Sequence, residues 1–447
     1  MNTPICDFVR HYAESNTVRL HMPGHKGKSI LGSESLDITE IDGADSLYEA
    51  SGIIAESERN ASALFGSDTY YSTEGSSLCI RAMLYLTCLH ARENGQKPLI
   101  WAGRNAHKVF LSAATLLDFE IEWLYPNSGD TYLCCKICPS ELEQRLANAK
   151  QLPTAIYITS PDYLGNIADI ATLSSICHRF GVLLLVDNAH GAYLRFLPTS
   201  QHPLDLGADA CCDSAHKTLP VLTGGAYLHL SKRLPPLWTM GAKQALSMFA
   251  STSPSYLILQ SLDMANARLE AEYPTALAQR IRSIDARKTE LVSHGYQFIG
   301  NEALKWTICT KEYGYLGTQL AERLRANGIV CEFADNDFLV LMFSIDTAEG
   351  DLERLQAALL AIPRQEAEFP APPVCHPAKR VLSPRNASLC PFEQIPVENA
   401  LGRVLASATV SCPPAVPIVV SGEQIDQWAI QAFQYYGIKN CLVVKAF

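Results

Sequence analysis

The stretch VLLLVDNAHGAY (182–193) decides the fold class of this chain. Its first five residues are apolar without interruption, which is typical of a strand that other elements cover on both faces. Asp187 follows this run directly. Because α/β sheets bind ligands beyond the carboxyl ends of their parallel strands, the stretch predicts a buried parallel strand with a ligand site at its end.

Further strands and helices are predicted on both sides of this stretch. The predicted strands lie at 99–102, 155–159 and 226–230, and the predicted helices lie at 109–117 and 169–180. Strands that alternate with helices in this way form a mostly parallel sheet with helices on both faces. We therefore expect an α/β protein with smaller α/β domains towards the C-terminus.

Four parts of the chain differ in their sequence pattern. Several glycines and prolines before residue 35 interrupt any periodicity and predict an irregular N-terminal arm. Leucines at helical spacing predict a helix at 351–362, and a proline-rich stretch at 368–377 predicts a domain boundary. The expected parts are an arm at 1–35, a large ligand-binding domain at 36–265, a small α/β domain at 266–367 and a C-terminal domain at 368–447.

The composition of the chain indicates which binding partners and which cell compartment to expect. A formal net charge of −10 over 447 residues argues against nucleic acid as a binding partner, because nucleic-acid binding needs a basic face. The apolar runs are too short to span a membrane, and the start of the chain lacks the apolar core of a secretory signal. Cys135 and Cys138 form a Cys-x-x-Cys motif without a second pair, so no metal site is expected. We expect a cytoplasmic protein.

Lys217 is the most informative single residue, in the segment SAHKT (214–218). A short strand is predicted at 207–211, so Lys217 would lie in a turn after it. Ser214 and His216 beside it can donate hydrogen bonds to a phosphate while the lysine reaches an aldehyde carbon. The alternative is an ordinary exposed lysine.

Three other segments could complete such a site. Asp187 at a strand end can pair with a protonated pyridine nitrogen, and the small Ala189 would let a flat ring approach; the alternative is an aspartate that caps the next element. Residues 72–77 precede an apolar helix at 78–90, so Gly75, Ser76 and Ser77 could bind an anion or simply cap this helix. His107 follows a predicted strand and could lie over a ring or serve a structural role.

The order of these features is more specific than any one of them. An anion-binding helix start, a histidine, a strand-end aspartate and a lysine thirty residues later supply the protein groups that a pyridoxal phosphate enzyme needs. The order therefore predicts pyridoxal 5'-phosphate as the cofactor and an amino acid as the small-molecule substrate.

Several longer segments resemble one family across nearly the whole chain. They are LHMPGHKG (20–27), RNAHK (104–108), VDNAHGAY (186–193), DSAHKTLPVLTGGAYLH (213–229), STSPSYLILQSLD (251–263), KRVLSPRNA (379–387) and the stretch 400–423. Together they resemble the short form of the bacterial Orn/Lys/Arg decarboxylases, which have the aspartate-aminotransferase-like, type I fold of pyridoxal phosphate enzymes.

The resemblance implies a role for each matching residue. Lys217 would form a Schiff base with the cofactor, Asp187 would bind the pyridine nitrogen, and His107 and Ala189 would contact the two faces of the ring. The phosphate and other cofactor contacts would come from Gly75, Ser76, Ser77, His190, Ser214 and His216. Thr252 and Ser253 would reach the cofactor of a neighbouring subunit, which implies a homodimer or a larger homo-oligomer.

Three positions depart from the family pattern. Glu74 stands where the family usually has Asn, and it would place an acid beside a phosphate unless it turns away or is protonated. Asn188 replaces a usual Glu, and Gly224 replaces a frequent Gln. These departures bear on substrate preference and rate.

The implied reaction is decarboxylation of arginine, lysine or ornithine to an amine, as in polyamine biosynthesis, with His107 or Lys217 returning a proton to Cα. Glu40, Asp42 and Asp45 could bind the distal cation of the substrate or could form a solvated acidic loop. One alternative is an aminotransferase or lyase, with Arg380, Arg385 or Arg403 as the carboxylate clamp. Another is a diverged paralogue that binds the cofactor without catalysis.

Overall fold

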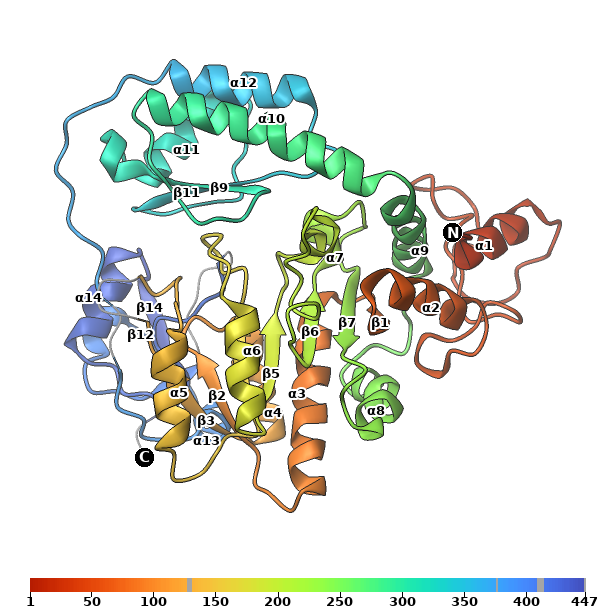
Figure 1. Cartoon of the computed structure of the whole chain (residues 1–447), viewed down its shortest axis with the longest axis horizontal. Coiled ribbons are helices and arrows are strands. Elements are labelled where there is room, and N and C mark those ends of the chain that lie inside the picture. Colours follow the sequence, from red (N-terminus) through yellow and green to blue (C-terminus); the bar gives the residue numbers. More distant parts are fainter. Residues whose placement is uncertain (127–130, 375–376, 408–413, 446–447) are drawn as a thin grey trace. The chain divides into compact units, whose positions relative to one another are not determined.

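The computed structural model describes residues 1–126, 131–374, 377–407 and 414–445. The chain divides into two compact units. Unit 1 consists of residues 1–96 and 170–278, and unit 2 consists of residues 97–169 and 279–447. Figure 1 labels most of the helices and strands of both units. The domain boundaries expected near residues 35, 265 and 367 stay predictions.

The largest sheet has seven strands in the order β1-β7-β6-β5-β4-β2-β3. Their bounds are β1 Asp68–Ser72, β2 Leu99–Gly103, β3 Glu120–Leu124, β4 Ala155–Thr159, β5 Leu183–Asp187, β6 Ala210–Asp213 and β7 Ala226–Leu230. β5 pairs with β6, and β2 pairs with β3 and β4, in parallel. β7 is antiparallel to both of its neighbours. The expected mostly parallel α/β sheet is confirmed.

Unit 1 contains the strands β1, β5, β6 and β7. Its helices are α1 Pro4–Glu14, α2 Ile53–Phe65, α3 Gly75–Glu93, α6 Ile170–Arg179, α7 Ala215–Thr218, α8 Pro236–Ser247 and α9 Tyr256–Ala271, with 3-10 turns at Leu47–Glu49 and Ala192–Phe196. β1 and β6 are both antiparallel to β7, so they are parallel to each other. The last residues of β1, β5 and β6, which are Ser72, Asp187 and Asp213, therefore lie at the same edge of this sheet.

The prediction of an irregular arm at 1–35 is wrong for the first part of this segment, because α1 occupies Pro4–Glu14. Ile5 and Val9 of this helix are fully buried. The Asp263 carboxylate of α9 accepts hydrogen bonds of 3.0 Å from the amides of Ile5 and Cys6, which have no acceptor within the helix. The acceptor that stabilises α1 is more than 250 residues away in the sequence, so the local pattern did not reveal it.

Unit 2 contains β2–β4 and two smaller sheets. Its helices are α4 Lys108–Leu117, α5 Pro139–Ala147, α11 Gly317–Ala326, α12 Glu349–Leu360, α13 Pro384–Leu389 and α14 Gln427–Tyr435, with 3-10 turns at Thr310–Tyr313 and Val397–Asn399. α10, Tyr273–Ser293, begins in unit 1 and ends in unit 2. The helix expected at 351–362 is confirmed by α12, with each end two residues earlier.

The two smaller sheets are antiparallel. One has the order β10-β11-β9-β8, and the other has the order β12-β14-β13. Their bounds are β8 Phe298–Ile299, β9 Lys305–Cys309, β10 Phe333–Ala334, β11 Phe338–Met342, β12 Phe392–Pro396, β13 Leu405–Ser407 and β14 Asn440–Val444. α10 and α12 lie on one face of the first of these sheets (Figure 1). Among the described residues, no helix has the length and apolar character needed to cross a bilayer.

Candidate active site

The edge of the sheet in unit 1 gathers most of the predicted site residues. In the sheet register, Ser72 lies opposite Ala226, Asp213 lies opposite Tyr227, and Asp187 is paired with Cys212. The helix α3 begins just after β1, and α7 begins just after β6. Parallel strands that end at one edge thus bring together segments that lie more than a hundred residues apart in the sequence.

The start of α3 has the features of an anion site. Gly75 takes a positive φ of 72° and donates its amide to the carbonyl oxygen of Gly224 at 2.7 Å. The Ser214 hydroxyl donates to the Ser76 hydroxyl at 2.8 Å, which places the two predicted phosphate-binding segments side by side. Amides in the first turn of a helix have no acceptor within the helix and point towards an incoming anion. Since the Gly75 amide is already used, the amides that follow it, including that of Ser77, are the expected donors.

Gly224 departs from the family pattern for a local reason. Its φ is +100°, and a Cβ atom at this position would lie 2.7 Å from the carbonyl oxygen of Thr73. The backbone that holds the Gly75 amide therefore accepts only glycine at 224.

His216 lies beside the start of α3. Its backbone amide donates to the Gly225 carbonyl oxygen at 3.1 Å, and its Nδ1 donates to the same oxygen at 3.0 Å. Because a carbonyl oxygen can only accept, Nδ1 carries a proton in this contact. Burial lowers the pKa of the ring and so favours its neutral form. Nε2 can donate to a phosphate only when the ring is protonated. The binding of a phosphate there would therefore be accompanied by proton uptake, and would strengthen as the pH falls towards the ordinary histidine pKa.

Lys217 was expected in a turn after the strand, and it lies on α7, a single helical turn directly after β6. The Lys217 amide donates to the Ser214 carbonyl oxygen, and the Leu219 amide donates to the Ala215 carbonyl oxygen. These two bonds close a short helical turn. The Lys217 Nζ atom lies 3.0 Å from Nε2 of the buried His190. The two nitrogens are at hydrogen-bond distance, and a lysine ammonium in this contact would donate to Nε2 of the His190 ring. His190 thus holds the lysine side chain in place.

Asp187 is the last residue of β5 and is only 2% exposed. Its Oδ1 atom accepts from the Ala189 amide at 3.3 Å and from the Cys212 thiol at 3.7 Å. The carboxylate is therefore held at the strand end by its own loop and by the neighbouring strand. Sequence reasoning missed Cys212, because only the pairing of β5 with β6 shows that it faces Asp187.

A buried hydrogen-bond network connects the Asp187 loop to the segment that carries Ser214 and Lys217. Asn188 donates through Nδ2 to Asp213 Oδ1 at 2.7 Å. Asp213 Oδ2 lies 3.1 Å from His202 Nε2 and 3.2 Å from His229 Nε2. All four side chains are fully buried. The two histidines hold the pKa of Asp213 below its ordinary value even though burial raises it, so the carboxylate stays ionised.

Restoring the usual family residue at 188 is therefore expected to destabilise this chain. Asn188→Glu would place a second buried carboxylate against Asp213, and one of the two would remain uncompensated. We expect the free energy of unfolding to fall by roughly 3 kcal/mol, the scale of an unpaired buried charge, in denaturant titrations. Asn188→Glu combined with Asp213→Asn re-forms an acid–amide pair and should recover most of this loss. An Asn188→Glu protein as stable as the parent would show that the contact between residue 188 and Asp213 does not contribute to stability.

Glu74 is turned away from the start of α3. Its Oε1 atom accepts from the Ser251 amide at 2.6 Å. This contact explains how an acid is tolerated beside a predicted phosphate site. Thr252 and Ser253, which follow, are exposed on this chain. Their contact with a neighbouring subunit stays a prediction.

His107 belongs to unit 2, whereas the other residues predicted to bind the cofactor belong to unit 1. Its Nδ1 accepts from the Val109 amide at 3.2 Å, so the side chain caps the start of α4. The neighbouring Arg104 donates to the carbonyl oxygens of Pro417 and Ile418 and pairs with Glu423 at 3.2 Å. The loop that carries His107 is thus anchored to the C-terminal segment. Stacking of His107 on a cofactor ring stays a prediction.

Asp45 lies next to the start of α2, and backbone amides engage its side chain. Its carboxylate accepts hydrogen bonds from five backbone amides, those of Ser46, Ser51, Gly52, Ile54 and Ala55. These bonds lower its pKa against the opposing effect of burial. Asp45 thus caps α2, a structural role that the sequence pattern did not indicate. Binding of a substrate cation by Glu40, Asp42 or Asp45 stays a prediction.

The three arginines considered as a carboxylate clamp are engaged within unit 2. Arg380 bonds to the Ile121 carbonyl oxygen and the Glu120 carboxylate. Arg385 donates to the carbonyl oxygens of Thr115 and Leu116, and Arg403 pairs with Glu393 at 2.7 Å. These contacts give each guanidinium a structural role, which weakens the aminotransferase alternative.

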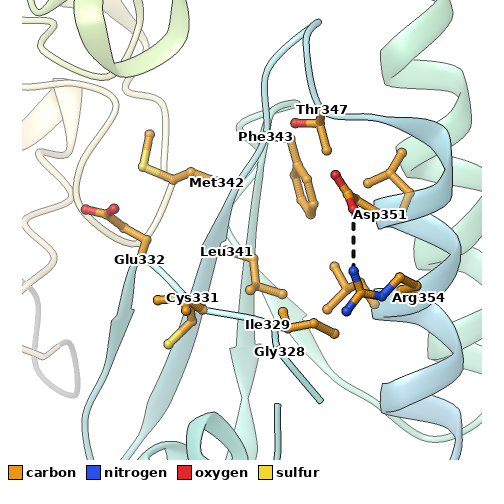
Figure 2. A pocket seen from close by; sticks show the side chains of 13 residues that line it. Gly328, Ile329, Cys331, Glu332, Leu341, Met342, Phe343, Thr347, Asp351 and Arg354 are labelled. Carbon is orange, nitrogen blue, oxygen red and sulfur yellow. Dashed lines mark ion pairs between the residues drawn. The ribbon is translucent and has the colours of Figure 1, made fainter. Parts of the chain in front are cut away.

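Unit 2 also contains a cavity of about 440 Å³ next to β11 and α12 (Figure 2). Figure 2 shows Asp351 and Arg354 on one side of it, joined by an ion pair of 3.9 Å. The described residues that line it include Leu341, Phe343 and Leu355, and none of the residues predicted to bind the cofactor. This cavity is therefore not the candidate active site.

Comparisons with known proteins agree with this geometry. Residues 3–308 match the model of the Orn/Lys/Arg decarboxylase major domain, and residues 379–440 match that of the Orn/Lys/Arg decarboxylase C-terminal domain. An arginine decarboxylase of Bacillus subtilis is 28% identical over 461 residues, covering 95% of this chain and 91% of the relative. The lysine decarboxylase LdcF of Francisella novicida superposes with a TM-score of 0.80 at 16% identity, over 99% of this chain and 81% of that chain.

Proposed function

Because this chain belongs to the Orn/Lys/Arg decarboxylase family of pyridoxal phosphate-dependent enzymes, we propose that it decarboxylates a basic amino acid to the corresponding amine. The candidate substrates are arginine, lysine and ornithine. We place arginine first, since the Bacillus subtilis relative is named an arginine decarboxylase. The observation that carries the proposal is the grouping of Lys217, Asp187, Ser214 and the start of α3 at one sheet edge.

The residues present fit pyridoxal phosphate. The start of α3 and the Ser214–Ser76 hydroxyl pair supply donors for a phosphate, and Glu74, the acid nearest in sequence, is bound to Ser251. Asp187 is a buried carboxylate of the kind that pairs with a pyridinium nitrogen. Lys217 would carry the cofactor covalently, with His190 close to its amine. Ser214, Ser76 and His216 would hold the phosphate, and Ala189 would pack against the ring.

When bound, the cofactor supplies an electron sink for the bond that breaks at Cα. The side chains around the cofactor would stabilise charge and transfer protons. Asp187 would pair with the pyridine nitrogen and hold a positive charge there, next to the negative charge that develops as carbon dioxide leaves. Lys217, whose Nζ lies 3.0 Å from His190 Nε2, would exchange a proton with Cα after carbon dioxide has left. His107 is the other candidate for this proton transfer.

Replacement of Asp187 tests its electrostatic role. Asp187→Asn keeps the shape of the side chain and the acceptor for the Ala189 amide, but it removes the negative charge. We expect kcat to fall by about 10²-fold with little change in stability, the effect of losing one preorganised charge at a reacting centre. Steady-state rates of amine formation measure the effect. Cys212→Ser, a variant of a residue that contacts Asp187 without changing charge, should lower kcat far less. Equal effects of the two variants would argue against the charge.

We further propose a homodimer or larger homo-oligomer in the cytoplasm, with a role in polyamine formation. The exposure of Thr252 and Ser253 supports the idea that this segment serves a neighbouring subunit. Incubation of the enzyme and cofactor with a panel of amino acids, with the products identified by mass, tests the substrate. Agmatine, cadaverine or putrescine as the main product would support the proposal, and keto acids as the main product would refute it.

A further inference from the structure

Asp213 is the last residue of β6 and is fully buried. Its Oδ1 atom accepts from Asn188 Nδ2 at 2.7 Å, and its Oδ2 atom lies 3.1 Å from His202 Nε2 and 3.2 Å from His229 Nε2. Burial favours the neutral carboxyl, but the two histidines hold the pKa of Asp213 below its ordinary value. Because an ionised carboxylate can only accept, it accepts from three side chains that come from different parts of unit 1.

The two histidines are themselves fixed in place. His229 lies on β7, and its Nδ1 atom lies 2.9 Å from the Thr69 hydroxyl of β1. The carbonyl oxygen of His202 accepts from the Asp205 amide at 3.0 Å, which closes a turn around this residue. The ring centroid of Phe65 lies 4.4 Å from that of His229 and 5.5 Å from that of His202. Asp213 is thus clamped by two rings that contact β1, α2 and their own loop.

Asn188 connects this clamp to the loop predicted to meet the cofactor ring. It lies between Asp187 and Ala189 in the sequence. Its backbone amide donates to the Cys212 carbonyl oxygen at 3.1 Å, and its side chain donates to Asp213 at 2.7 Å. Two hydrogen bonds therefore attach the loop to β6, one through the backbone and one through the clamped carboxylate.

The other side of Asp213 leads to the predicted cofactor lysine. Ser214 follows directly, and the amide of Lys217 donates to the Ser214 carbonyl oxygen at 3.0 Å. The contact between Asn188 and Asp213 thus joins the loop of Asp187 to the short helix of Lys217. A ligand that meets both residues at once depends on the spacing between them, because binding groups act together only when they are held in a fixed geometry.

We propose that Asp213 is a positioning residue of the candidate active site. Held by two buried histidines, its carboxylate fixes Asn188 and so sets the place of the Asp187 carboxylate relative to Lys217. A phosphorylated pyridine aldehyde, which would meet Asp187 through its ring nitrogen and Lys217 through its aldehyde carbon, depends on this spacing. This consequence for ligand binding rests on the proposed function.

Asp213→Asn tests the proposal, because one amide oxygen cannot accept from three donors and the clamp is lost with little change in shape. The full-length chain freed of cofactor is titrated with pyridoxal phosphate, which is followed by its visible-range absorbance, and with inorganic phosphate as a competitor. We expect the Kd of pyridoxal phosphate to rise at least about tenfold, and the affinity for inorganic phosphate, which needs only the phosphate site, to stay the same. Equal losses for both ligands, or no loss for either, would overturn the proposal.

Asp209 offers a matched control at the other end of β6. It directly precedes this strand and is only 4% exposed. Its carboxylate lies 3.0 Å from His178 Nε2 and accepts from the Leu184 amide at 2.8 Å. Asp209→Asn should lower the free energy of unfolding, as Asp213→Asn does, but leave the Kd of pyridoxal phosphate unchanged. Equal rises in this Kd would show that Asp213 acts through stability alone and would overturn the proposal.

Asn188→Ala covers the case in which Asp213→Asn does not fold. It removes the same contact from the other side and leaves the histidine bonds of Asp213 in place. It should also weaken pyridoxal phosphate without weakening inorganic phosphate, and the double variant should bind no worse than the weaker single variant, since both changes remove one contact. Parent-like affinity in Asn188→Ala, or additive losses, would overturn the proposal. A parent chain that does not bind pyridoxal phosphate would refute the proposed function as well.

Discussion

Lys217→Ala is expected to reduce amine formation by more than about 10³-fold, the largest effect of any single change in this chain. The variant loses the group that would hold the cofactor and also a group that would exchange a proton with Cα. General acid–base catalysis alone contributes about 10²–10⁴-fold in enzymes. The purified variant should also lack the visible-range absorbance of a cofactor bound covalently to lysine.

An exposed lysine in the same unit serves as the control for this variant. Lys232 lies on the surface, and Lys232→Ala should retain both the absorbance and the activity. Denaturant unfolding of both variants should give stabilities close to that of the parent. A Lys217→Ala protein with full activity would show that the catalytic lysine has been assigned wrongly.

Glu423→Gln is expected to cause the largest loss of stability. Arg104 and Glu423 are 5% and 2% exposed and lie 3.2 Å apart within unit 2. The substitution leaves the buried guanidinium without its counter-charge, and such a change costs about 3–5 kcal/mol. Denaturant titration should show this loss. The loop that carries His107 is held by the same contacts, so it should also become more susceptible to proteolysis.

The chain offers a matched exposed pair for comparison. Arg380 and Glu120 lie 2.9 Å apart, but both side chains are more than 40% exposed. Glu120→Gln should change the free energy of unfolding by less than about 1 kcal/mol, as is usual for surface ion pairs. Equal losses in Glu120→Gln and Glu423→Gln would mean that burial of the Arg104–Glu423 pair has no energetic consequence.

Much of the fold could be predicted because the central strands are continuous apolar runs. The strands expected at 99–102, 155–159, 182–186 and 226–230 match β2, β4, β5 and β7 to within one residue at each end. β1 was not predicted, because its sequence DTYYS is short and polar, and only its pairing with β7 makes it a strand. The antiparallel direction of β7 was not visible either, since apolar periodicity is the same in both directions.

The candidate site likewise contains residues that could be predicted from the sequence and residues that could not. Asp187, Ser214 and Lys217 could be found from the sequence, because each lies at or just after a strand end in a distinctive local motif. Cys212, His202 and His229 could not, because their contacts with Asp187 and Asp213 depend on strand register and on a distant loop. Asp45 resembled a ligand-binding acid by composition, and only its five backbone partners reveal a capping role.

The fate of the substrate carboxylate tests the central claim most directly. Arginine, lysine and ornithine labelled with ¹³C at the carboxyl carbon would each be incubated with the enzyme and pyridoxal phosphate, and the gas and amine products would be quantified. For one of the three substrates, a decarboxylase should release one labelled carbon dioxide for each unlabelled amine that it forms. Label retained in a keto acid, or turnover without labelled carbon dioxide, would contradict it.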